Sequence, residues 1–195
     1  MPFIEASGLR MYYERRGEGP RLLYISGTGG DLRAKPGVFD SPLPARFDVL
    51  AYDQRGLGQT AAPPGPYSMA AYAGDATALL DGIGWERCAV IGVSFGGMVA
   101  QEFALRHPER VERLVLACTS SGGAGGASYP LHELTALDAE AHADRMLHLN
   151  DTRTAERSTR NPDRHAALVA ALANATRAAP ATTGGDEGKR LQLEA

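Results

Sequence analysis

A serine between glycines is the residue whose setting most clearly predicts chemistry in this sequence. Gly92–Gly96 (GVSFG) has the pattern G-x-S-x-G, and Gly97 follows it directly. A serine hydroxyl is a weak nucleophile, so it must project from the backbone toward a base. A sharp turn from a strand into a helix holds a serine in that position, and glycines leave room for the close approach of strand and helix. The pattern predicts Ser94 as a nucleophile, supported by Gly92, Gly96 and Gly97.

A glycine-rich loop earlier in the chain could stabilise the negative charge of such a reaction. Ser26–Gly30 (SGTGG) follows the apolar run Arg21–Ser26, which is typical of a buried strand. An oxyanion hole needs two backbone N–H donors, one from the residue after the nucleophile and one from a loop after an earlier strand. We therefore expect the N–H groups of Phe95 and Thr28 to form it. A plain turn between a strand and a helix is the alternative interpretation of this loop.

The elements that must position these residues follow from the hydrophobic pattern. Helices are predicted at residues 68–84 and 95–107, and strands at residues 3–6, 9–14, 21–26, 47–53, 88–93 and 111–117. Continuous apolar strands that alternate with helices indicate the α/β class, a mostly parallel sheet of about six strands with helices on both faces. The first two strands are expected to form an antiparallel hairpin at one edge.

The pattern changes after residue 117. Residues 119–128 are rich in glycine and serine, and no strand pattern follows them. Helices are expected over residues 134–149, from the N-cap Asn161 to about residue 176, and from residue 189 onward. We therefore expect a core at residues 1–120 and a helical cap segment at residues 121–195, packed over the carboxyl ends of the strands.

Composition excludes several classes of function. The chain has 195 residues and a net charge of −3, which does not favour nucleic acid or an anionic membrane as a partner. No apolar run is long enough to span a bilayer, and the start of the chain lacks a signal-peptide pattern, so a cytoplasmic protein is expected. Cys88 and Cys118 lie in apolar runs and are expected to be buried free thiols.

No cofactor or metal is expected, because the competing motifs are incomplete. A dinucleotide fingerprint starting at Gly27 would need glycine at position 32, where the chain has leucine. Gly188 and Lys189 are followed by arginine rather than the serine or threonine of a phosphate-binding loop, and H-E-x-x-H does not occur.

Taken together, the motifs resemble the α/β-hydrolase superfamily, and within it the small esterase and lactonase members grouped with 3-oxoadipate enol-lactonases. The stretches that carry the resemblance are Ser26–Gly30, Asp53–Gly58, Gly92–Gly97 and Arg106–Val111. The resemblance implies hydrolysis of a small-molecule carboxylic ester or lactone through an acyl-enzyme on Ser94. One departure is that the first of these loops begins Ser-Gly, where the family usually has His-Gly.

The resemblance also implies that the catalytic acid and histidine follow the nucleophile in chain order, on loops after later strands. We therefore interpret the chain as incomplete at its C-terminus. His107 is expected about 20 Å from Ser94 along the helix, and the expected cap carries the other histidines, His132, His142, His148 and His165. Asp53 is expected to anchor the Arg-Gly turn that follows it.

Two other functions fit the same residues. A non-catalytic binding fold or decayed pseudoenzyme would keep the pocket without turnover. An acyltransferase or cofactor-free peroxidase-type member would use the same serine with a different acceptor. Sequence downstream of residue 195 and product analysis with competing acceptors would distinguish them from a hydrolase.

Overall fold

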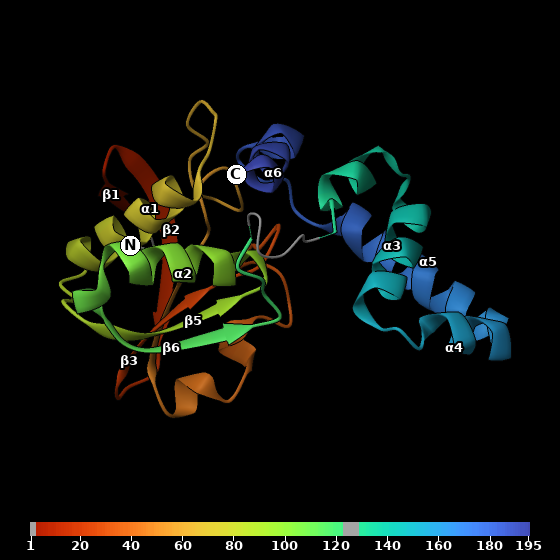
Figure 1. The fold of residues 1–195 in the computed structure, drawn as a ribbon, viewed down its shortest axis with the longest axis horizontal. Helices are drawn as coiled ribbons and strands as arrows, with labels where there is room; N and C mark the ends of the chain where they lie inside the picture. The colour runs from red at the N-terminus through yellow and green to blue at the C-terminus, as the bar shows by residue number, and fades with distance from the viewer. Residues whose placement is uncertain (1–2, 123–128) are drawn as a thin grey trace. The chain divides into compact units, whose positions relative to one another are not determined.

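The protein is built around a six-stranded sheet with the strand order β1-β2-β4-β3-β5-β6. The computed structural model describes residues 3–122 and 129–195 (Figure 1). Strands β3 to β6 run parallel, and β1 and β2 are antiparallel at one edge. This confirms the predicted α/β class. The strands are β1 (Phe3–Ala6), β2 (Leu9–Arg16), β3 (Arg21–Ile25), β4 (Asp48–Tyr52), β5 (Cys88–Val93) and β6 (Val111–Ala117).

The centre of the sheet is fully buried. Leu23 of β3 lies opposite Leu50 of β4 and Val90 of β5, and all three side chains are 0% exposed. Central parallel strands are covered on both faces, which is why their sequences are continuous apolar runs rather than alternating ones. The carboxyl ends of β3 and β5 therefore lie side by side, and the loops that leave them meet.

Two long helices cover one face of the sheet. Helix α1 (Met69–Gly82) begins after the N-cap Ser68, whose side chain accepts a hydrogen bond from the N–H of Ala71. Helix α2 (Phe95–Arg106) packs beside it. Figure 1 shows these helices on one side and a segment of short 3₁₀ turns on the other. These turns are η1 (Val38–Asp40) and η2 (Leu43–Ala45). A third turn, η3 (Pro108–Arg110), lies between α2 and β6.

The chain divides into two compact units, and the division differs from the expected cap of residues 121–195. Unit 1 comprises Met1–Ser128 and Ala181–Ala195, and unit 2 comprises Tyr129–Pro180. Helix α6 (Gly185–Glu194) thus groups with the sheet. The reason is packing, because Leu191 joins the hydrophobic core of unit 1 and Gln192 is 0% exposed.

Unit 2 is helical throughout, and the described residues after 130 contain no strand, as expected. The helix predicted over residues 134–149 is interrupted, because Asp138 caps α3 by accepting a hydrogen bond from the N–H of Ala141. Asn161 caps α5 as predicted, accepting from the N–H of Arg164. The elements are η5 (Leu131–Ala136), α3 (Ala139–Asn150), α4 (Thr154–Arg160) and α5 (Pro162–Ala178). None of the helices within residues 3–122 and 129–195 has both the length and the apolar character needed to cross a bilayer.

Strand β6 is the other edge of the sheet, and within the described residues it pairs with β5 alone. The side chains of Leu114, Val115 and Leu116 are 38%, 52% and 42% exposed. Cys118, directly after this strand, is also exposed, so its expected burial is wrong, whereas Cys88 is buried as expected. The difference arises because Cys88 starts a central strand and Cys118 follows an edge strand. Residues 123–128 of the predicted glycine-serine connection lie outside the described residues.

Candidate active site

Ser94 lies at the turn between β5 and α2, where the sequence predicts it. Its backbone has φ 53° and ψ −121°, a conformation that costs on the order of 1–3 kcal/mol for a residue with a side chain. Two hydrogen bonds hold it there. The Ser94 N–H donates to the carbonyl of Ala117 over 2.8 Å, and the Ser94 carbonyl accepts from the N–H of Gly97 over 2.8 Å. The end of β6 and the start of α2 together fix this backbone.

The glycines around Ser94 are required by close backbone contacts. A Cβ atom on Gly92 would lie 2.4 Å from the carbonyl oxygen of Gly96, and one on Gly96 would lie 2.2 Å from the carbonyl oxygen of Ile25. A Cβ atom on Gly97 would lie 2.5 Å from the Cβ of Thr119. Side chains at these positions would push α2 away from β3 and β5, so the glycines allow the sharp turn that projects Ser94.

The loop after β3 passes directly beside Ser94. A Cβ atom on Gly27 would lie 3.3 Å from the Cβ of Ser94 and 3.9 Å from its hydroxyl oxygen. The N–H of Gly30 donates to the carbonyl of Gly27 over 3.1 Å and closes the loop into a turn. The side-chain amide of Gln54 donates to the carbonyl of Ser26 over 2.7 Å and secures the start of the loop.

The two N–H groups expected to form the oxyanion hole are not used elsewhere. Within residues 3–122 and 129–195, neither the Thr28 nor the Phe95 N–H donates a hydrogen bond to a protein acceptor. Phe95 is the first residue of α2, so its N–H is also one of those that a helix leaves unpaired at its positive end. Neither group is therefore tied to a protein acceptor.

Two glutamines that we did not predict hold this loop in place. Gln54 contacts its first residue, and Gln192 of α6 accepts a hydrogen bond from the N–H of Gly29 over 2.8 Å. Both glutamine side chains are 0% exposed. No local sequence pattern predicts them, because their role depends on contacts between distant parts of the chain.

Asp53 anchors the turn that follows β4, as expected. It is 0% exposed, and its carboxylate accepts hydrogen bonds from the N–H groups of Leu32 over 2.8 Å and Gln59 over 2.9 Å. Burial outweighs these bonds and raises the pKa of Asp53 to about 6. Gly58 makes room for the carboxylate, since a Cβ there would lie 2.1 Å from one of its oxygens.

Arg55 supports the residue after the nucleophile through a chain of contacts. Its guanidinium donates two 2.7 Å hydrogen bonds to the carboxylate of Asp75 and lies over the ring of Tyr72. The ring of Tyr72 in turn meets Phe95 edge-on, with centroids 5.1 Å apart. A paired, half-buried arginine of this kind positions its neighbours, and it fixes the Phe95 side chain beside Ser94.

The general base is the part of the expected triad that unit 1 does not supply. His107 is the single histidine in this unit, and it caps the far end of α2, beside Phe103 and 3.8 Å from Glu109. The other histidines belong to unit 2. Unit 1 as described presents the strained Ser94, two N–H groups without a protein acceptor and the N-terminus of α2. This arrangement can direct the serine hydroxyl at a carbonyl carbon and stabilise the resulting oxyanion.

Comparison with known proteins agrees with this geometry. A family model described as the alpha/beta hydrolase fold matches residues 20–178. A 2-hydroxymuconate semialdehyde hydrolase of Pseudomonas putida is 39% identical over 132 residues, which are 66% of this chain and 44% of the relative. An uncharacterized protein of Mycobacterium tuberculosis is 36% identical over 149 residues, 76% of this chain and 43% of the relative.

Among solved structures, the enol-lactonase from Burkholderia xenovorans LB400 superimposes with a TM-score of 0.70 and 28% sequence identity. The match covers 99% of this chain and 72% of the lactonase. The regions matched in the two curated relatives are less than half of their length.

Proposed function

The chain belongs to the α/β-hydrolase family, and from this premise we propose that Ser94 is the nucleophile for hydrolysis of a small carboxylic ester or lactone. The observation that carries the proposal is the strained Ser94 backbone, which lies against the Gly27 loop. The N–H groups of Thr28 and Phe95 in addition donate to no protein acceptor within residues 3–122 and 129–195. A strained backbone persists only where surrounding structure enforces it, and such residues cluster at functional sites.

The proposed reaction begins with attack of the Ser94 hydroxyl oxygen on the carbonyl carbon of the substrate. The carbonyl oxygen becomes an oxyanion, which accepts hydrogen bonds from the N–H groups of Thr28 and Phe95. The carbon–oxygen bond to the leaving group then breaks, and the departing alkoxide takes up the proton that the Ser94 hydroxyl has lost, so the alcohol is released. Water attacks the acyl-enzyme in the same way and releases the carboxylic acid and the serine.

An ester or lactone is the substrate class that this chemistry and the similarity to an enol-lactonase support. The buried side chain of Phe95 and the neighbouring Met98 favour a small apolar acyl group. Unit 1 places no imidazole beside Ser94, so we expect slow turnover from this chain alone. Loss of a triad member leaves roughly 10³–10⁴-fold catalysis over water in serine hydrolases.

Turnover of p-nitrophenyl acetate by the purified chain and its Ser94→Ala variant tests the proposal. Ser7→Ala is the matched control, because Ser7 is a second serine with positive φ, at 51°, in the hairpin turn between β1 and β2. We expect Ser94→Ala to abolish turnover above background and Ser7→Ala to leave it unchanged. Equal turnover by all three proteins would contradict the proposal. In a second assay with an added alcohol, formation of a new ester would favour acyl transfer over hydrolysis.

A further inference from the structure

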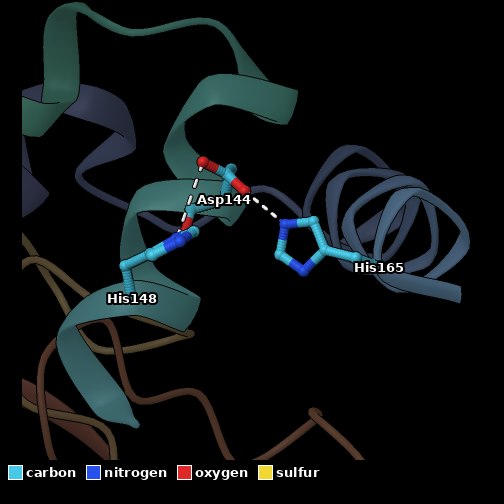
Figure 2. Close-up of side chains that lie close together, drawn as sticks. All are labelled: Asp144, His148 and His165. Carbon is cyan, nitrogen blue, oxygen red and sulfur yellow. Dashed lines mark hydrogen bonds and ion pairs between the residues drawn. The ribbon is translucent and has the colours of Figure 1, made fainter. Parts of the chain in front are cut away.

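Unit 2 contains a cluster of metal-ligating side chains that the proposed hydrolysis does not use. Asp144 and His148 lie one turn apart on α3, and His165 lies on α5. Residues four apart on a helix share a face. Figure 2 shows the Asp144 carboxylate between the two imidazole rings, which come from different helices.

The three side chains are already within reach of a common ion. One ligand atom from each residue lies within 4.8 Å of the others. The His165 Nε2 atom is 2.6 Å from Oδ1 of Asp144. The His148 Nδ1 atom is 3.7 Å from Oδ2 of Asp144 and 2.9 Å from its backbone carbonyl oxygen. Donor atoms around a tetrahedral zinc are about 3.3 Å apart, given bonds of about 2.0 Å. Small side-chain rotations bring the observed separations to that value.

The two histidines of the cluster are held between helices, whereas the Asp144 side chain is 46% exposed. The side chain of His165 is 17% exposed and that of His148 is 32% exposed, so both rings are held within the packing of α3 against α5. Their rings meet edge-on with centroids 5.7 Å apart. Preorganised imidazoles lose little freedom when they bind an ion, and Asp144 provides a compensating negative charge.

Unit 2 also has little apolar core to stabilise it. Its buried residues among those described are Leu134, Ala143, Thr154 and Ala173. Four of its leucines are at least 36% exposed, namely Leu137, Leu149, Leu168 and Leu172. Small units with a thin core commonly rely on a metal or another cross-link for stability. An ion held by α3 and α5 would join the two longest helices of this unit.

We propose that Asp144, His148 and His165 bind one divalent transition-metal ion, with Zn²⁺ the best match and solvent at the remaining position. Two imidazole nitrogens and one carboxylate oxygen suit zinc, whereas Mg²⁺ and Ca²⁺ require oxygen ligands. The ion replaces the direct contact between His165 and the Asp144 carboxylate, and also the 2.9 Å hydrogen bond between His148 Nδ1 and the Asp144 backbone carbonyl. It cross-links α3 to α5. The site is independent of the proposed ester hydrolysis, which needs no metal.

Isothermal titration of the chelator-treated full chain with Zn²⁺ tests the site, with Mg²⁺ as the ion that should not bind. We expect one Zn²⁺ per chain and a higher melting temperature when Zn²⁺ is present. His148→Ala and His165→Ala should each weaken Zn²⁺ binding at least tenfold. His142→Ala is the matched control, because His142 lies on α3 outside the cluster, and it should leave the affinity unchanged.

A variant that preserves packing makes the result decisive. His165→Gln keeps a side-chain N–H donor for Asp144 but lacks the imidazole, so it should fold, as judged by circular dichroism, and lose Zn²⁺ affinity. On the unmodified chain, Co²⁺ should give the visible absorption of a tetrahedral nitrogen and oxygen site. Any of three results would overturn the proposal: unchanged Zn²⁺ affinity in His165→Gln, no saturable Zn²⁺ binding, or octahedral Co²⁺ absorption. The contact between α3 and α5 would then be a metal-free hydrogen bond.

Discussion

The side-chain carbonyl of Gln192 accepts a 2.8 Å hydrogen bond from the backbone N–H of Gly29. The bond joins α6 to the loop that carries the expected oxyanion donor Thr28. Gln192 thereby holds this loop, which passes beside Ser94.

Replacing Gln192 tests how much this contact stabilises unit 1. Gln192→Ala removes the acceptor and leaves the Gly29 N–H without its partner, so we expect the free energy of unfolding to fall by about 1–3 kcal/mol. Urea denaturation followed by tryptophan fluorescence measures the change. Lys189→Ala, on the exposed face of the same helix, should stay within about 0.5 kcal/mol of the parent. Equal effects of the two substitutions would show that α6 does not hold the loop.

Gly96 and Gly74 are two helical glycines with opposite surroundings. A Cβ on Gly96 would collide with the backbone of β3, whereas one on Gly74 of α1 meets nothing within 4 Å. Gly96→Ala should lower the free energy of unfolding by about 1–3 kcal/mol or more. Gly74→Ala should raise it by roughly 0.5–1 kcal/mol, because alanine favours the helix. Thermal denaturation of both variants checks the pair, and a tolerated Gly96→Ala would contradict the tight turn.

Asp53 should make the free energy of unfolding decrease as pH rises. Its folded pKa of about 6 lies above the ordinary carboxyl pKa of 3.8, so between these values the folded state binds more protons than the unfolded state. The contribution of Asp53 to stability is therefore fully present below pH 3.8 and is lost as pH rises through about 6, by roughly 3 kcal/mol in total.

Asp53→Asn isolates this contribution, because asparagine does not titrate. Urea unfolding of the parent and the variant between pH 4 and 7 gives the difference in their free energies of unfolding. We expect the free energy of unfolding of the parent minus that of the variant to decrease as pH rises. A constant difference, or one that grows with pH, would mean that Asp53 is ionised in the folded protein at pH 4.

The exposed apolar strand β6 should promote association of this chain. Edge strands with unpaired backbone groups and apolar side chains pair with other chains. Val115→Lys places a charge on this edge and should raise the soluble monomer fraction measured by size-exclusion chromatography with light scattering. Leu105→Lys removes a side chain that is 80% exposed on helix α2 rather than on the edge strand. If Leu105→Lys improves solubility equally, general surface hydrophobicity rather than the edge is responsible.

Local signals account for the parts of the structure that the sequence predicted well. The turn at Ser94 is enforced by glycines within three residues of it, and the N-caps Ser68 and Asn161 bond to residues three positions ahead. The strands of the sheet are short apolar runs whose burial follows from their composition. In each case the residues that determine the local structure are neighbours in the chain.

Long-range packing explains what the sequence did not predict. Helix α6 joins unit 1 through Leu191 and Gln192, whose partners lie more than a hundred residues earlier. The exposure of Cys118 depends on β6 being the sheet edge in the described residues, which its own apolar pattern does not indicate. The cluster of Asp144, His148 and His165 requires α5 to fold back on α3, a packing that no spacing rule predicted.

Covalent labelling of Ser94 tests the central claim most directly. The purified chain is incubated with p-nitrophenyl acetate, quenched in acid and digested, and the peptides are examined by mass spectrometry beside those of Ser94→Ala. We expect one acetyl group per chain, on the peptide that contains Ser94, and no acetylation of that peptide in the variant. Acetyl groups only on lysines or on other serines, at equal levels in the two proteins, would contradict the assignment of Ser94 as the nucleophile.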